Sequence, residues 1–165
     1  MKRPTIRELA RKLLHVDDTP RRTALAYSIG VFIGFSPFLG FHTLLGLAIA
    51  FVFGLNRAAI LLGVWSNMPL WIVPYYSVAT GLGMALTGFR LEGSALGELF
   101  RLGKEGGFLA SAFWKHLASQ WGLFVSFHVG SLLLAGLLAL AAYPLSFKWI
   151  LFYRRRRGLP SEPSA

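Results

Sequence analysis

Residues 23–56, TALAYSIGVFIGFSPFLGFHTLLGLAIAFVFGLN, contain no Asp, Glu, Lys or Arg. Two further stretches, residues 58–89 and residues 120–147, share this property. Each is longer than the about 20 apolar residues that a helix needs to cross a membrane. A helix of such length in a soluble protein would carry a charged face toward water, and these stretches have none. The sequence therefore predicts an all-α integral membrane protein.

Two breaks centred on proline interrupt these stretches, near residues 36–41 and 66–69. Proline lacks an amide hydrogen and disfavours helical geometry in the residue before it, as at Ser36-Pro37. Non-helical backbone at membrane depth is tolerated only inside protein or beside a water-filled cavity. We therefore expect the two breaks to face each other or a polar cavity, with antiparallel packing of the two broken segments.

The helices between the breaks are short. We predict helices over residues 20–35, 42–54 and 57–66, and a fourth from the second break to about residue 88. At 1.5 Å per residue the first three measure about 24, 20 and 15 Å, against a hydrocarbon core of about 30 Å. Broken or re-entrant helices, such as a hairpin over residues 20–56, therefore fit better than regular spans. Residues 121–147 form the clearest transmembrane helix.

The segments divide by composition. We predict a cytoplasmic amphipathic leader over residues 1–18 and a broken-helix membrane core over residues 19–89. An interfacial amphipathic linker over residues 90–120 follows. A transmembrane helix over residues 121–147 and a basic cytoplasmic tail over residues 148–165 complete the chain.

The net charge of +10 lies almost entirely outside the hydrophobic stretches. A pI near 10.7 would suggest nucleic acid as the partner of a soluble protein. Here the basic residues flank hydrophobic segments, which favours anionic membrane lipids as partners and no nucleic acid. Because both ends are basic, we expect a multi-pass protein of the bacterial cytoplasmic (inner) membrane with both termini in the cytoplasm.

Polar residues inside the hydrophobic stretches are the candidates for a ligand-binding site. Ser36, His42 and Asn67 lie at or beside the breaks, and Arg57 is the charge between the first two stretches. Ser36 also fits a helix cap, and Arg57 also fits a side chain that extends to the membrane surface. Half-helix N-termini near the breaks would suit a phosphate or carboxylate.

The sequence lacks the groups of residues that are typical of enzyme active sites. The hydrophobic stretches hold no carboxylate pair for acid–base chemistry, the histidines lack metal-ligand spacing, and there is no cysteine. We therefore predict no catalytic residues, no metal site, no cofactor and no enzymatic activity. The spacing of Gly30 and Gly34 allows close helix packing, either within one chain or in a homo-oligomer.

Part of the sequence resembles a bacterial membrane family known as domain of unknown function 2062. The resemblance covers about residues 19–88 and implies membrane residence but no activity. It is carried by Thr19-Pro20, Ile29-Gly30-Val31-Phe32-Ile33-Gly34-Phe35-Ser36-Pro37, Gly40-Phe41-His42-Thr43, Leu55-Asn56-Arg57, Trp65-Ser66-Asn67 and Pro74-Tyr75-Tyr76.

Two functions from different classes remain open. The first is the transport or flipping of an anionic lipid or amphiphile through a polar cavity at the two breaks. The alternative is a non-transporting accessory or scaffold protein of the cell envelope, which the small size and the lack of intramembrane acids favour.

Overall fold

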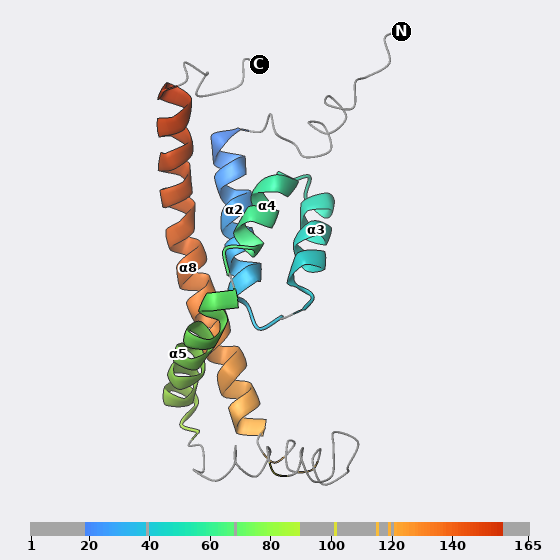
Figure 1. Ribbon diagram of the computed structural model, residues 1–165, viewed down its shortest axis with the longest axis vertical. Coiled ribbons are helices and arrows are strands. Elements are labelled where there is room, and N and C mark those ends of the chain that lie inside the picture. Colours follow the sequence, from blue (N-terminus) through green and yellow to red (C-terminus); the bar gives the residue numbers. More distant parts are fainter. Residues whose placement is uncertain are drawn as a thin grey trace. The chain divides into compact units, whose positions relative to one another are not determined.

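The computed structural model describes residues 19–38, 40–67, 69–89, 101, 115, 119 and 121–156 (Figure 1). Within these residues the fold is all-helical, and five helices are delimited. They are α2 (Pro20–Phe35), α3 (His42–Val52), α4 (Arg57–Val64), α5 (Pro69–Thr87) and α8 (Trp121–Arg156). The predicted leader and nearly all of the predicted linker lie outside the described residues.

The chain divides into two compact units. The first comprises residues up to Ile72 and from Leu132 onward, and the second comprises Val73–Ser131. The first unit therefore holds α2, α3, α4 and the C-terminal part of α8. The second holds most of α5 and the beginning of α8.

Helix α2 begins and ends where the sequence predicts. The Thr19 hydroxyl accepts a 3.2 Å hydrogen bond from the Arg22 amide, and Pro20 occupies the first helical position, where its missing amide hydrogen is harmless. At the other end Ser36 has an extended backbone, as expected for a residue before proline. The first break therefore follows from Ser36-Pro37.

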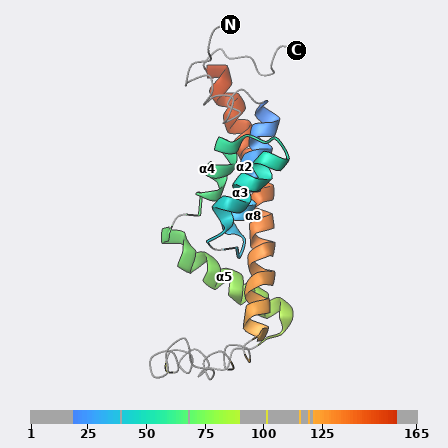
Figure 2. The same ribbon diagram turned by 90° about the vertical axis from the view of Figure 1, so that its right-hand side faces the viewer.

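Helices α2 and α4 lie side by side with their backbones in contact (Figures 1 and 2). A Cβ atom added at Gly30 would collide with the carbonyl oxygen of Ile60, and one added at Gly34 would collide with that of Val64. Residue numbers rise together along this contact, so α2 and α4 run parallel. The expectation of antiparallel packing is wrong for these two helices, because α3 carries the chain back before α4 begins.

The turn between α3 and α4 returns the chain to the end where α2 begins. Gly54 adopts a left-handed backbone with φ of 59°, and Arg22 Nη2 donates a 3.0 Å hydrogen bond to its carbonyl. Asn56 then caps α4 by accepting a 3.0 Å hydrogen bond from the Ala59 amide. The chain thus reverses direction between α2 and α3, and α3 ends at Val52, before the turn.

A small apolar core joins α2, α3 and α4. Its buried members come from all three helices and from the α3–α4 turn. They are Ala26, Ile33, Ala50, Leu55, Ala59, Ile60 and Val64.

Helix α8 has 36 residues and is about 54 Å long, which exceeds the hydrocarbon core. Among the described residues it is the one helix long and apolar enough to cross a membrane. In the first unit, Ser28 Oγ donates a 2.9 Å hydrogen bond to the Ala139 carbonyl and so joins α2 to α8. The helix includes Pro144 and continues past the predicted end at residue 147 to Arg156. Basic residues in its last turn favour this extension, because their positive charges interact favourably with the negative end of the helix dipole.

The second unit packs α5 against the start of α8. Gly83 and Gly130 allow this approach, since a Cβ atom at either position would collide with a backbone carbonyl of the other helix. The Tyr75 hydroxyl donates a 3.1 Å hydrogen bond to the Ser131 carbonyl, and the rings of Tyr76 and Phe127 lie 5.2 Å apart. Small residues therefore set the helix contacts in both units.

Candidate functional site

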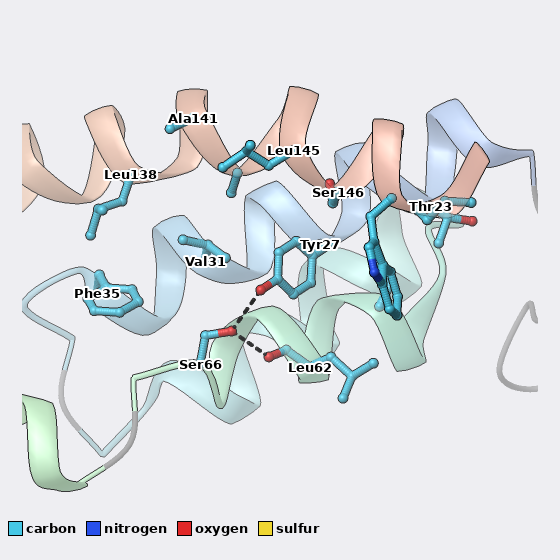
Figure 3. A pocket seen from close by; sticks show the side chains of 14 residues that line it. Thr23, Tyr27, Val31, Phe35, Leu62, Ser66, Leu138, Ala141, Leu145 and Ser146 are labelled. Atoms are coloured by element: carbon cyan, nitrogen blue, oxygen red, sulfur yellow. Dashed lines mark hydrogen bonds between the residues drawn. The ribbon is translucent and has the colours of Figure 1, made fainter. Parts of the chain in front are cut away.

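A groove of about 750 Å³ lies between α2, α4 and α8 in the first unit (Figure 3). Its walls are mostly apolar, with a few hydroxyl groups. The lining residues are Thr23, Tyr27, Val31, Phe35, Ala59, Leu62, Ser66, Leu138, Ala141, Ala142, Leu145, Ser146, Trp149 and Ile150.

Helical periodicity builds each wall. Thr23, Tyr27, Val31 and Phe35 recur every four residues, so they form one stripe along α2. The opposite wall is the corresponding face of α8 between residues 138 and 150. Thr23 and Ser146 lie near one end of the groove, and Phe35 and Leu138 lie near the other (Figure 3). Trp149 and Ile150 also line the Thr23 end, so the few hydroxyl groups lie among apolar side chains along the groove.

Two hydroxyl groups meet partway along the groove. Tyr27 Oη and Ser66 Oγ are 3.1 Å apart, and Ser66 Oγ also donates a 2.9 Å hydrogen bond to the Leu62 carbonyl (Figure 3). Serine has one hydroxyl hydrogen. While Ser66 donates that hydrogen to Leu62, the Tyr27 phenol is the donor between the two hydroxyls. Both hydroxyl hydrogens of the pair are then used within the protein.

Positive charge gathers at the Thr23 end of the groove. Arg21 and Arg22 precede Thr23 in the first turn of α2, and Lys148 is exposed beside the groove-lining Trp149 on α8. The N-termini of α2 and α4 lie at this end too, since Arg22 reaches the Gly54 carbonyl just before α4. Helix N-termini carry partial positive charge. The C-terminus of α3 at Val52 lies at this end as well, so helix ends of both signs meet here and the positive charge comes from the exposed basic side chains.

The opposite ends of α2 and α4 meet at the two breaks. Asn67 Nδ2 donates a 2.9 Å hydrogen bond to the Gly34 carbonyl, so the two breaks face each other, as predicted. The C-termini of α2 and α4 meet the N-termini of α3 at His42 and of α5 at Pro69 here, so helix ends of both signs lie at the breaks.

The predicted site residues do not line the groove. Ser36 is buried and donates a 2.6 Å hydrogen bond to the Ile33 carbonyl, which is the capping role. Asn67 also binds the last turn of α2, so the structure brings Ser36 and Asn67 to the same helix end. His42 is partly exposed at the first position of α3. Arg57 begins α4 at the opposite end from the breaks, and its guanidinium lies 4.0 Å from the centre of the Phe51 ring.

Sequence reasoning missed Tyr27 and the α8 wall. A signal was present, because Thr23, Tyr27, Val31 and Phe35 have the spacing of one helix face. Tyrosine on an apolar helix face is common in membrane proteins, however. No sequence pattern near Tyr27 indicates that it contacts Ser66, which lies 39 positions later. Within the described part of the chain, no three His, Cys, Asp or Glu side chains are placed to hold a metal ion.

Comparison with known proteins gives one match. The sequence profile of a family described as "Uncharacterized protein conserved in bacteria (DUF2062)" matches residues 3–158, which extends well beyond the resemblance over residues 19–88. No curated protein and no solved structure matches the chain significantly.

Proposed function

The chain belongs to the bacterial DUF2062 family, and we propose that it is a multi-pass protein of the cytoplasmic membrane that binds and moves an anionic lipid or similar amphiphile. The ligand's hydrocarbon chain lies in the groove between α2, α4 and α8. The protein carries out no covalent chemistry on the ligand.

Apolar surface supports residence in a membrane. Large hydrophobic side chains are exposed on α3 and along α8, including Val52 at 77% and Leu140 at 73% exposure. Contiguous apolar surface of this kind is rare in soluble monomers. Hydrocarbon is the solvent that accommodates it without cost. With α8 as one crossing, the shorter helices enter the membrane as broken or re-entrant segments.

The groove is the observation that carries the proposal. Its volume of about 750 Å³ falls within the range of small-molecule sites, which are mostly apolar with a few placed polar groups. The exposed basic residues near Thr23 suit a charged headgroup, and the mostly apolar walls suit a hydrocarbon chain. The binding site is therefore assigned to the groove rather than to a cavity at the breaks.

Reconstitution into liposomes tests the movement of the ligand. We expect the protein to accelerate exchange of a fluorescent anionic phospholipid between leaflets, measured by quenching with an impermeant reductant. Ala141→Phe fills the groove from α8 and should abolish the acceleration. Leu140→Phe changes the neighbouring exposed residue, which does not line the groove, and should leave the acceleration intact. Equal exchange rates in both variants and in protein-free liposomes would refute transport.

A specific observation favours the alternative of a non-transporting accessory protein. The α2 and α4 backbones touch at Gly30, Gly34 and Gly63, which leaves little room for these helices to slide. A protein of this kind would bind lipid in the groove without moving it. Lipid binding that depends on Ala141, in the absence of exchange between leaflets, would select this alternative.

A further inference from the structure

We infer that a hydrocarbon chain in the groove fastens the end of α4 and the second break to α2, because it seals the Tyr27–Ser66 hydrogen bond from water. This inference rests on the proposed function and deepens it. It names the local structural change that ligand binding in the groove controls.

Two hydrogen bonds tie the second break to α2. Tyr27 Oη and Ser66 Oγ are 3.1 Å apart, and Asn67 Nδ2 donates a 2.9 Å hydrogen bond to the Gly34 carbonyl. Ser66 and Asn67 are consecutive residues just after α4. Their partners on α2 are seven residues apart, which is about 10 Å along the helix axis. The chain at the second break is therefore held to α2 at two separate points.

Only the first of these bonds lies in the groove. Tyr27 and Ser66 both line it, whereas Gly34 and Asn67 do not (Figure 3). Thr23 lies one helical turn before Tyr27, beside the exposed side chain of Arg21. Water therefore reaches the hydroxyl pair from this end of the groove while the groove is empty.

A hydrocarbon chain acts on this bond by excluding water. In the empty groove, a Tyr27 hydroxyl that leaves Ser66 bonds to water instead, so the separation costs little. In the filled groove it has no such partner, because hydrocarbon neither donates nor accepts, and a buried hydroxyl without a partner is costly. The ligand therefore stabilises the bond without making a polar contact of its own.

This coupling is reciprocal. Ser66 Oγ also donates to the Leu62 carbonyl, and both residues belong to the α4 wall of the groove, so the bond from Tyr27 holds this wall in place. If the ligand stabilises the attachment of α4 to α2, the attachment must raise the affinity for the ligand by the same factor.

Hydrogen exchange in the full-length protein in detergent tests the inference, with phosphatidylglycerol as the probe. The amides of Trp65 and Ser66 report on the end of α4, because they donate to the Leu61 and Gly63 carbonyls. We expect saturating lipid to slow their exchange about five-fold or more, as for one hydroxyl left unsatisfied on opening. The Phe53 amide after α3 is the internal control and should exchange at the same rate with and without lipid, because α3 does not line the groove.

Two variants remove the bond from opposite sides. Tyr27→Phe keeps the ring, so lipid should still bind, but it should no longer slow the exchange, and its affinity should fall by the factor that is lost. Ser66→Ala should have the same effect, so the test does not depend on the folding of one variant. Tyr143→Phe alters an exposed tyrosine of α8 that does not line the groove and should behave as the unaltered protein.

The outcomes distinguish this inference from the proposed function. Lipid binding that is lost in Ala141→Phe, yet leaves the Trp65 and Ser66 amides unaffected, would overturn the coupling and leave the groove as a lipid site. Slowing of the same size in Tyr27→Phe would likewise overturn it. Binding that is insensitive to Ala141→Phe would instead overturn the proposed function.

Discussion

Asn67 donates a 2.9 Å hydrogen bond from Nδ2 to the Gly34 carbonyl, so the second break of the chain caps the helix that ends at the first break. The last carbonyls of a helix have no intrahelical partner and need one from elsewhere. Here a side chain 33 positions away supplies it. This contact ties the second break to the last turn of α2.

Replacing Asn67 should weaken the fold. Asn67→Ala leaves the Gly34 carbonyl without this donor, and we expect a loss of about 1 kcal/mol in stability. Thermal unfolding in detergent, followed by circular dichroism, measures the change. Ser77→Ala is the control, because Ser77 is exposed and donates only within its own helix, to the Val73 carbonyl. Equal melting temperatures for the two variants would contradict the capping role.

Adding a methyl group at the α2–α4 contact should be far more damaging. Gly30→Ala places a Cβ atom against the Ile60 carbonyl, so the helices must separate, at a cost of about 1–3 kcal/mol or more. Gly136→Ala is the matched control within α8, where an added Cβ atom has no neighbour within 4 Å. Size-exclusion chromatography after heating reports both. A Gly30→Ala protein as heat-resistant as the control would refute direct backbone contact.

Both termini should lie in the cytoplasm. The basic residues near Thr19 and those in the last turn of α8 predict this orientation, because positive residues are retained on the cytoplasmic side. Reporter fusions before Met1 and after Ala165 check the two ends independently. Activity of a periplasmic reporter at one end only would contradict an even number of crossings, and activity at both ends would contradict the predicted orientation.

Histidine 42 provides a test between the groove and a site at the breaks. His42→Ala should leave binding of anionic lipid unchanged, because His42 does not line the groove. Binding to detergent-solubilised protein measures this, with Ala141→Phe as the variant expected to lose affinity. A large loss of affinity in His42→Ala alone would return the ligand site to the breaks.

Local chemistry made the helix boundaries of the first unit predictable. Thr19-Pro20, Ser36-Pro37 and Asn56 each act on the residues beside them, and the structure places helix ends at all three. Gly30 and Gly34 were recognised as a close-packing surface, and their partner proved to lie within the same chain. Helix α8 continues past the predicted boundary at residue 147, because that boundary marks the end of the stretch without charges and not the end of the helical pattern.

The site was harder to predict because it depends on long-range pairing. Ser36, Asn67 and Arg57 are polar residues in apolar surroundings, yet the first two serve the backbone and the third contacts Phe51. No pattern within the sequence shows that α2 faces residues 138–150 of α8. The parallel course of α2 and α4 was also hidden, because it depends on α3 carrying the chain back between them.

Pro144 lies within the stretch of α8 that forms the groove wall. Without an amide hydrogen it cannot bond to the Leu140 carbonyl, so α8 bends more easily here than elsewhere. The facing wall is stiff, because the backbones of α2 and α4 are in contact. A groove with one rigid wall and one flexible wall can change its width to fit the shape of the hydrocarbon chain. The protein should therefore tolerate chains of differing length and unsaturation while remaining selective at the lipid's polar end.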